Sequence, residues 1–317
     1  MLAVVYDGKS ASLQERPRPR CSRSEAVVAV RTAGVCGTDL EILKGYMGFR
    51  GVMGHEFVGV VVEGPPAWMG KRVVAEINCV CGRCDMCTSG LSNHCRDRGV
   101  VGIDHRDGVF AEFVALPTAN LHSLPEGLDD AAAVFVEPLA AAMRVLRQVK
   151  VESAGGVVVI GDGRLGQLVA RVVKSVGAKC LLVGRHAGKL EAAEKQGIET
   201  VLAERFVPAA KAGVVVDASG AAGGLELAMR TVRPRGTIVL KSTFTGGGPN
   251  PAPLVINEVT VVGSRCGPFP EAIAALASGK VDVSSLVSGR FPLGQALEAL
   301  EAAGNRDNIK VLIDVQR

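Results

Sequence analysis

The sequence predicts an α/β protein in two parts, a β-rich part and a doubly wound parallel sheet with helices on both faces. Residues 1–137 contain short runs rich in β-branched residues, such as EAVVAVRTAG and EFVGVVVEG, which glycine and proline separate. From about residue 138, continuous apolar runs alternate with segments at helical spacing. Strands that are apolar throughout and alternate with helices are typical of a parallel sheet covered on both faces.

Five apolar runs predict the strands of this sheet. They are VVVI (157–160), CLLV (180–183), VVVD (214–217), TIVLK (237–241) and VTVVG (259–263). Segments at helical spacing, such as RLGQLVARVVKSVG and GKLEAAEKQG, lie between several of them. After Cys266 we expect a short helix over EAIAALASG and a closing strand over IKVLIDV.

The composition is that of an ordinary globular protein. The chain has 317 residues, which is enough for two domains with cores of their own. Hydrophobic residues make up 48% and charged residues 21%, which disordered chains do not show. The formal net charge of +4 is small and the basic residues are scattered. Because a nucleic-acid surface needs concentrated basic charge, we expect no nucleic-acid partner.

The amino terminus and the apolar runs predict a cytoplasmic protein without a membrane partner. The opening MLAVVYDGKS lacks the basic start, long apolar centre and cleavage site of a signal peptide. No apolar run approaches the roughly 18 residues that would suggest a membrane span. In a reducing cytosol, clustered cysteines hold metal more often than they form disulfides.

A cysteine cluster predicts a structural zinc site. Five of the nine cysteines lie between residues 77 and 95. The spacing C-x2-C-x2-C-x7-C is formed by Cys81, Cys84, Cys87 and Cys95. Two residues between thiols let neighbouring sulfurs converge, and the polar loop at 88–93 lets the fourth fold back to complete a tetrahedron. Gly82 and Gly90 supply the tight backbone that such a site needs.

Three other interpretations of this cluster are weaker. The bacterial iron–sulfur run ends in Cys-Pro and has a different spacing. A thioredoxin-type redox pair would not need the third and fourth thiols. A set of disulfides is disfavoured by the compartment.

A glycine-rich loop predicts a dinucleotide site. The strand VVVI runs directly into GDGRLG, and an amphipathic helical segment follows. The glycines permit a tight turn and a close approach of backbone amides to a pyrophosphate at the helix amino terminus. The motif alone is weak evidence, but its place between a buried strand and a helix makes it credible. The predicted contacts are Gly161, Gly163, Arg164, Leu165 and Gly166.

The end of the second strand favours NADP over NAD. About twenty residues after the glycine loop, an NAD site carries an acidic residue that holds the ribose hydroxyls. This chain has Gly184, Arg185 and His186 there. Glycine removes the carboxylate that would repel a 2′-phosphate, and Arg185 can pair with one. If Arg185 is only a solvated loop charge, the preference between the two cofactors stays open.

Three further segments carry candidate metal ligands. They are GVCGTD (34–39), GHE (54–56) and VEPLA (136–140). Each could be structural by itself. Together they resemble the zinc-dependent medium-chain alcohol and polyol dehydrogenases, as do MLAVVYDG…ERPRP, GVCGTDLEILKG, GHEFVGVV, GVFAEFVALP, FVEPLAAA and IKVLID in the same order. The Glu-Pro-Leu form looks most like the glucose, sorbitol and threonine dehydrogenase branch. The resemblance covers nearly the whole chain.

The resemblance implies a domain plan. A GroES-like catalytic domain would comprise residues 1–137 and 266–317, with the structural zinc lobe at 77–98. A Rossmann dinucleotide-binding domain would comprise residues 138–265. Relatives of this kind are dimers and tetramers, so a homo-oligomer is expected.

The resemblance also implies the roles of the candidate ligands. Cys36, His55 and Glu137 would hold a catalytic zinc, with Glu56 as a fourth and sometimes labile ligand. Three or four protein ligands leave a position for substrate, so that the metal can act as a Lewis acid. Thr38 would take the proton of the alcohol. Asp39 would orient the imidazole of His55.

Further cofactor contacts are implied by the resemblance alone. Ser219 and Gly220 would border the adenosine side of the cofactor. Ser242, Thr243, Val262 and Gly263 would lie near the nicotinamide, and Lys310 near the pyrophosphate.

The implied function is hydride transfer between a nicotinamide cofactor, with NADP favoured, and a secondary alcohol, polyol or sugar, or the corresponding carbonyl. One alternative is a relative with altered chemistry, such as a reductase of aldehydes or activated double bonds. Zinc-independent reductases of this superfamily generally lack Cys36, Glu137 and the four-cysteine lobe, which this chain retains. Another alternative is a sensor that binds the dinucleotide without catalysis.

The sequence departs from the family pattern at one position of the proton relay. Relatives commonly carry a histidine five residues after the zinc-binding cysteine, and this chain has Glu41. Either Glu41 carries the proton, or Thr38 passes it directly to water. The segments 45–54 and 64–72 are short, and such loops shape the substrate pocket, so the natural substrate is not determined by the sequence.

Overall fold

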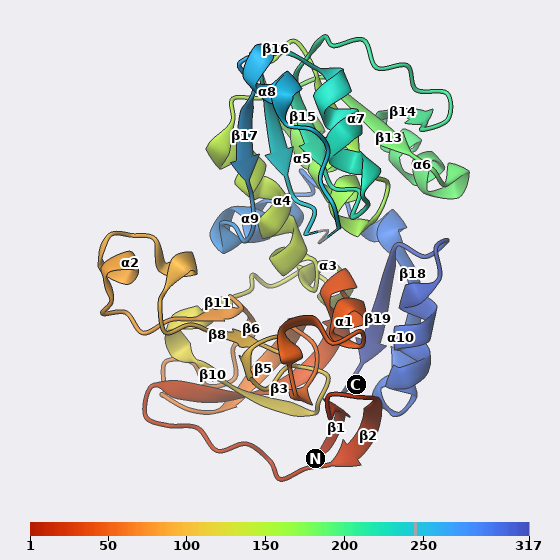
Figure 1. Cartoon of the computed structure of the whole chain (residues 1–317). Helices are drawn as coiled ribbons and strands as arrows, with labels where there is room; N and C mark the ends of the chain where they lie inside the picture. Colours follow the sequence, from red (N-terminus) through yellow and green to blue (C-terminus); the bar gives the residue numbers. More distant parts are fainter. Residues whose placement is uncertain (244–245, 317) are drawn as a thin grey trace. The chain divides into compact units, whose positions relative to one another are not determined.

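The computed structural model describes residues 1–243 and 246–316 (Figure 1). The chain forms two compact units. The first comprises Met1–Glu137 and Val287–Arg317, and the second comprises Pro138–Leu286. Each unit is built on a main sheet of its own.

The first unit is built on a seven-stranded, mostly antiparallel sheet. Its strand order is β11-β6-β5-β3-β19-β18, and β10 also pairs with β3. The long strand β3 has room for both neighbours, because β10 pairs with residues 25–29 and β19 pairs with residues 32–34. The strands are β3 (Glu25–Gly34), β5 (Glu56–Glu63), β6 (Arg72–Ala75), β10 (Phe113–Pro117), β11 (Leu121–Ser123), β18 (Val287–Pro292) and β19 (Lys310–Asp314).

Smaller elements complete the first unit. The hairpin β1 (Leu2–Tyr6) and β2 (Ala11–Glu15) forms a three-stranded sheet with β4 (Gly51–Val52). A second small sheet joins β7 (Asn78–Cys79), β8 (Gly99–Val101) and β9 (His105–Arg106), and it carries the cysteine-rich loop. The core is aliphatic with a few aromatic rings, and Phe110 and Leu116 are fully buried in it.

The second unit contains a six-stranded sheet in which all neighbouring strands are parallel, with the order β14-β13-β12-β15-β16-β17. In chain order this is 3-2-1-4-5-6, the arrangement of a Rossmann dinucleotide-binding sheet. The five predicted strands are all present as β12 (Val157–Ile160), β13 (Cys180–Gly184), β15 (Ala212–Asp217), β16 (Val232–Leu240) and β17 (Thr260–Gly263). The sequence analysis missed β14 (Glu199–Leu202), whose residues are only partly buried or exposed.

Helices connect most successive strands of this sheet, but none of the described helices lies between β14 and β15, and α4 and α9 lie outside the run of strands. The predicted helix after the glycine loop is α5 (Arg164–Ser175), and the second predicted helix is α6 (Ala187–Glu194). Further helices are α4 (Val136–Gln148), α7 (Gly223–Thr231), α8 (Ala252–Ile256) and α9 (Phe269–Ala277). In the described part of the chain, none of the helices combines the length and the apolar character needed to cross a membrane.

The return of the chain to the first unit comes later than the sequence analysis expected. We expected it at residue 266, whereas the structure keeps residues up to Leu286 in the second unit. Helix α9 buries Phe269, Ala272 and Leu276, and its Glu271 forms an ion pair with Arg147 of α4. Helix α9 therefore packs as part of the second unit. We placed the boundary directly after the last predicted parallel strand, and the sequence of that strand does not show where the following helix packs.

Two valines of the second unit test this assignment of its core. Val215 is fully buried in the central strand β15, whereas Val207 is 80% exposed. We expect Val215→Ala to lower the free energy of unfolding by about 2 kcal/mol, because it removes two buried methyl groups and leaves a cavity. The matched change Val207→Ala should alter it by less than about 0.5 kcal/mol. Urea-induced unfolding measures both, and equal effects would contradict the described core.

Candidate active site

A thiol, an imidazole and a carboxylate meet in the first unit. One ligand atom from each of Cys36, His55 and Glu56 lies within 4.8 Å of the others. Strand pairing explains why they meet: β3 and β5 are antiparallel, with Gly34 opposite Glu56, so the chain leaves β3 at Cys36 beside the start of β5. His55 and Glu56 are buried, whereas Cys36 is partly accessible.

Asp39 contacts both Cys36 and His55 of this cluster. Its side chain is completely buried, its Oδ2 accepts the backbone N–H of Cys36 at 2.7 Å, and its Oδ1 lies 3.3 Å from Nδ1 of His55. A carboxylate facing Nδ1 holds the proton on that nitrogen and leaves the lone pair of Nε2 for a metal. Asp39 thus lies beside the imidazole that we expected it to orient, and its role there stays a prediction.

The surroundings of His55 also favour a cation. Burial by itself lowers the pKa of the imidazole, but the Asp39 carboxylate and the Cys36 sulfur raise it more, so that the pKa lies well above 6.5. A positive charge is therefore stabilised at this position, and a bound metal would have to displace the proton. The side-chain types and their burial fit zinc, which combines sulfur, nitrogen and carboxylate oxygen ligands.

Lys310 lies in this cluster, which the sequence analysis did not foresee. Its ammonium forms an ion pair with Glu56, donates to the carbonyl of Val35 at 3.3 Å and lies 5.7 Å from the ring centroid of Phe135. Burial lowers the pKa of Lys310 to about 8. The structure thus shows Lys310 as the charge partner of a candidate metal ligand, and its expected contact with a pyrophosphate stays a prediction.

Glu137 lies outside the group that the other three candidate ligands form. It is in the first turn of α4 and is the last residue of the first unit before the chain enters the second. Among the described residues, the candidate metal group at this place comprises Cys36, His55 and Glu56 only. The structure therefore brings Glu56, the expected fourth ligand, together with Cys36 and His55, and ligation by Glu137 remains a prediction.

The two candidate proton carriers differ in position. The hydroxyl oxygen of Thr38 lies 3.8 Å from the sulfur of Cys36, next to the cluster. Glu41 lies on the exposed side of the short helix α1 (Gly37–Ile42) and forms a salt bridge with Lys44 at 2.8 Å. Thr38 is thus the better placed of the two to meet a substrate at the cluster.

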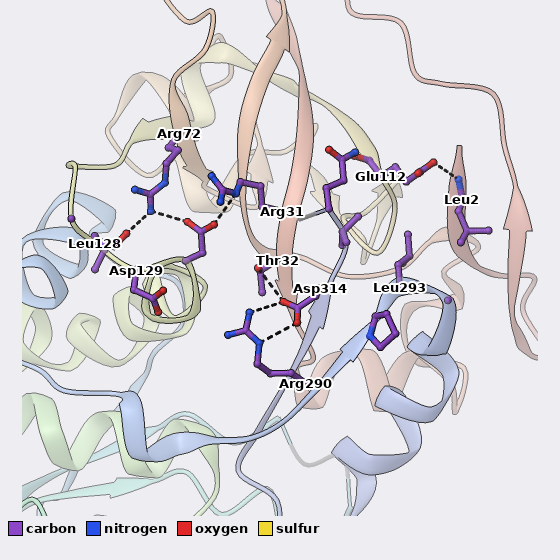
Figure 2. Close-up of a pocket in the computed structure, with 16 residues that line it drawn as sticks. Leu2, Arg31, Thr32, Arg72, Glu112, Leu128, Asp129, Arg290, Leu293 and Asp314 are labelled. Atoms are coloured by element: carbon purple, nitrogen blue, oxygen red, sulfur yellow. Dashed lines mark hydrogen bonds and ion pairs between the residues drawn. The ribbon is translucent and has the colours of Figure 1, made fainter.

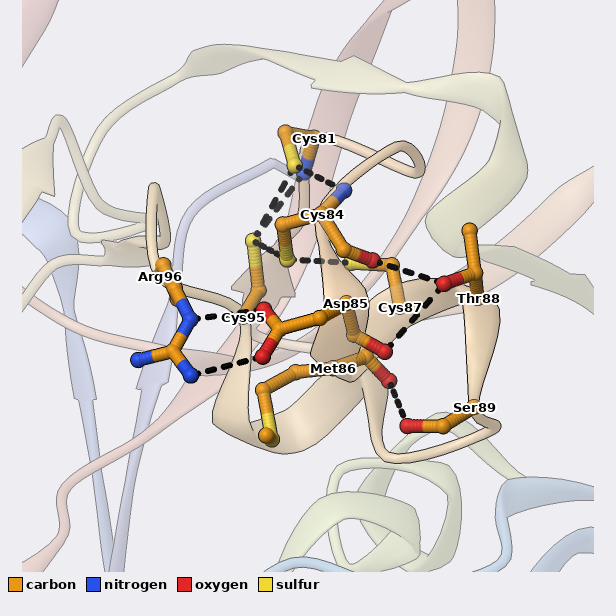
Figure 3. Close-up of polar contacts among 9 residues, drawn as sticks. All are labelled: Cys81, Cys84, Asp85, Met86, Cys87, Thr88, Ser89, Cys95 and Arg96. Atoms are coloured by element: carbon orange, nitrogen blue, oxygen red, sulfur yellow. Dashed lines mark hydrogen bonds and ion pairs between the residues drawn. The ribbon is translucent and has the colours of Figure 1, made fainter.

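The four predicted cysteines of the lobe converge on one point. Figure 3 shows their sulfurs directed toward one another, and all four lie within 4.8 Å of each other. The sulfurs of Cys81 and Cys95 are 3.5 Å apart, as are those of Cys84 and Cys87, and none of the four is in a disulfide. Gly82 and Gly90 adopt positive φ angles of 72° and 78°, as the tight turns require.

The protonation of the lobe also points to a metal. Hydrogen bonds from the backbone amides of Arg96 and Cys87 lower the pKa of the Cys84 thiol to about 6. Desolvation and the neighbouring sulfurs raise the pKa of Cys87 to about 12. Four adjacent thiolates cannot all carry charge without a cation, and a bound zinc would supply it.

The glycine loop lies between β12 and α5, as predicted. Gly161 has a φ of +112°, and a Cβ atom on Gly166 would lie 1.8 Å from the carbonyl oxygen of Gly161. The loop is therefore tight enough to exclude side chains at these positions. Gly163 is the residue before the first residue of α5, and no described side chain caps this helix end.

The predicted cofactor residues of the second unit lie at one edge of its sheet. The strand ends are in register, because Ile160 pairs with both Val183 and Asp217, and Leu240 pairs with both Asp217 and Gly263. This carboxyl edge carries the residues 161–166, 184–186, 219–220, 242–243 and 262–263. Dinucleotides bind at this edge in open parallel sheets.

A cavity in the first unit is distinct from the cysteine–histidine cluster. It has a volume of about 970 Å³, and its lining includes residues of β3, β6, β18, β19 and the segment 127–130 (Figure 2). Its three arginines are each paired with an aspartate: Arg31 and Arg72 with Asp130, and Arg290 with Asp314. The charges are thus satisfied within the protein, which does not suggest a catalytic centre.

Comparisons with known proteins agree with this geometry. Residues 22–126 match the family model of the alcohol dehydrogenase GroES-like domain, and residues 165–278 match that of zinc-binding dehydrogenases. The chain is 30% identical to the sorbitol dehydrogenase of Halalkalibacterium halodurans, with 95% of each chain covered. The chain therefore belongs to the zinc-binding alcohol dehydrogenase family.

Solved structures show the same architecture over the full length. A zinc-binding dehydrogenase from Sinorhizobium meliloti, bound to NADP, is 27% identical and superposes with a TM-score of 0.92 over 99% of both chains. An alcohol dehydrogenase from Escherichia coli CFT073, complexed with NADH, is also 27% identical, with a TM-score of 0.91 and the same coverage.

The lobe provides a direct test of metal binding. We expect the purified protein to contain about two zinc ions per chain, and Cys95→Ser to contain about one, because three thiolates hold a structural zinc poorly. The matched control Cys21→Ser changes a cysteine outside both candidate sites and should keep both ions. Metal analysis by inductively coupled plasma spectrometry measures the content, and an unchanged zinc content in Cys95→Ser would contradict the assignment.

Proposed function

We propose that this protein is an NADP-preferring, zinc-dependent dehydrogenase of secondary alcohols, polyols or sugars, or of the corresponding carbonyls. The observation that carries the proposal is the buried group of Cys36, His55 and Glu56, with Asp39 directed at the imidazole. A chain that combines this group with a glycine loop on a parallel sheet has the parts that hydride transfer between an alcohol and a nicotinamide requires.

The residues of the first unit would hold the metal and the reacting oxygen. Cys36, His55 and a carboxylate from Glu56 or Glu137 would be the ligands, and a bound zinc would act as a Lewis acid on the substrate oxygen. Lys310 keeps Glu56 charged and in place through their ion pair. Thr38 would accept the proton of the substrate hydroxyl, because its oxygen lies beside Cys36.

The residues of the second unit would bind the cofactor. The backbone amides of the glycine loop and of the start of α5 would hold the pyrophosphate. Solved relatives include one with NADP and one with NADH, so the preference must come from residues of this chain. Gly184 and Arg185 at the end of β13 support NADP, because a carboxylate is missing where an NAD site has one and a guanidinium is next to it.

The substrate class rests on the named relatives. Among them are a sorbitol dehydrogenase and an L-galactonate-5-dehydrogenase, which act on polyhydroxylated substrates. We therefore expect a polyol or a sugar derivative. A screen of polyols, sugars and simple secondary alcohols with NADP and NAD, followed by the absorbance of the reduced nicotinamide, identifies the substrate.

Replacing the candidate thiolate ligand tests the catalytic proposal. We expect Cys36→Ser to lower kcat/KM at least about 100-fold, because the substrate oxygen loses several kcal/mol of stabilisation. Binding of NADPH, followed by its fluorescence, should stay unchanged, since Cys36 is not in the nucleotide-binding unit. Cys21→Ser serves again as the control. A Cys36→Ser protein that turns over normally would rule the proposal out.

We also propose a homo-oligomer. Strand β17 is an edge of the parallel sheet, and its residues are mostly exposed. The preceding helix α8 exposes Val255 and Ile256 by 77% and 78%. An open strand edge beside exposed apolar side chains favours association with a second copy. Sedimentation equilibrium should give a dimer or tetramer, and a monomer at micromolar concentration would contradict this part of the proposal.

A further inference from the structure

The second residue of the glycine loop, Asp162, is buried and bound to the turn after β13. Only 5% of the surface of Asp162 is exposed to solvent. Its Oδ2 accepts the backbone N–H groups of Arg185 at 2.8 Å and of His186 at 2.7 Å. Nδ1 of His186 lies 3.0 Å from Oδ1 of the same carboxylate. One carboxylate therefore holds the backbone and one side chain of this turn.

Asp162 also excludes any side chain at position 184. A Cβ atom built on Gly184 would lie 2.5 Å from both the Cβ and the Oδ2 of Asp162. Real Cβ atoms do not approach other atoms so closely, so one of the two residues would have to move. An acidic side chain at 184 would face the additional repulsion of a second carboxylate at contact distance.

This exclusion matters because position 184 is the end of the second strand. An NAD site usually has its ribose-binding acid at this place. Asp162 cannot replace that acid, since its oxygens are already engaged by two amides and an imidazole. The carboxylate instead fixes the turn that carries Arg185 and His186, the two residues able to donate to a 2′-phosphate.

The contact with Asp162 also determines which ring nitrogen of His186 carries a proton. An ionised carboxylate only accepts hydrogen bonds, so Nδ1 of His186 carries a proton. The remaining nitrogen, Nε2, is then the one left to meet a ligand, and it donates when the ring is protonated. His186 is thereby held in one orientation next to Arg185.

We propose that Asp162 is the specificity-determining residue for the cofactor: it bars an acidic residue from position 184 and positions Arg185 and His186 to receive the 2′-phosphate of NADP. The inference rests on the proposed dinucleotide-dependent function. It assigns the choice of cofactor to a residue inside the glycine loop, which acts through the turn after β13.

Binding of NADPH and NADH to four proteins tests this inference, with reduced-nicotinamide fluorescence as the readout. The proteins are the wild type, Asp162→Gly, Gly184→Asp and the double variant. The wild type should prefer NADPH. Asp162→Gly should lower the ratio of NADPH affinity to NADH affinity by about tenfold, because the turn loses its anchor. Gly184→Asp alone should weaken both cofactors, because the new side chain collides with Asp162.

The double variant gives the sharpest result. With Asp162 removed, the new aspartate at 184 has room and can accept the ribose hydroxyls, so NADH should bind more tightly than NADPH. The two changes should thus be strongly non-additive, as expected for side chains in contact. Additive effects, or a double variant that keeps the wild-type ratio, would overturn the inference.

Two further variants separate specificity from folding. Asp162→Asn keeps the size of the side chain and, if Asp162→Gly does not fold, takes its place with the same expected fall in the ratio. Asp282→Asn is the matched control, because Asp282 also accepts a backbone amide, that of Ser284 at 2.8 Å, away from the glycine loop. Its ratio should stay within about twofold of the wild type.

The outcomes distinguish the inference from the proposed function. If the wild type binds neither nucleotide, the proposed function fails and the inference with it. If the wild type prefers NADPH and the Asp162 variants weaken both cofactors equally, Asp162 is only structural and the inference alone fails. A wild type that prefers NADH overturns the inference together with the NADP preference of the proposed function, but leaves the proposed zinc-dependent hydride transfer standing.

Discussion

A buried carboxylate, that of Asp39, connects the two chain segments on which the candidate metal centre depends. It accepts the amide of Cys36 and faces Nδ1 of His55, and it has no exposure to solvent. A buried charge is costly unless it is paired and hydrogen-bonded. The register between β3 and β5 must therefore bring Cys36 and His55 to the same carboxylate, and this requirement fixes the geometry of the first unit around the cluster.

The same device recurs in the nucleotide-binding unit. Asp162 accepts the amides of Arg185 and His186, and Asp217 accepts the amide and the hydroxyl of Ser219. The carboxylates of Asp162 and Asp217 thus take the place of water as hydrogen-bond acceptors for backbone amides at the carboxyl edge of the parallel sheet. Polar groups that would be expensive to bury alone thus become fixed points of the site.

Much of this could be predicted from the sequence, because the signals are local. Apolar runs identified the parallel strands, and cysteine spacing identified the lobe. Strand β14 was missed because ETVL is short and has only two apolar residues, so it lacks the continuous apolar run of the other strands. The ion pair of Lys310 with Glu56, the exclusion at Gly184 by Asp162 and the place of α9 depend on residues distant in the chain, which only the folded structure brings together.

Anomalous scattering at the zinc edge, from crystals of the zinc-loaded protein, tests the central claim most directly. We predict two peaks in each chain. One should lie among the four sulfurs of the lobe, and the other about 2.0–2.3 Å from the sulfur of Cys36 and a nitrogen of His55, with a carboxylate oxygen as a further ligand. A peak in the lobe alone, with Cys36 and His55 holding no metal, would contradict the account.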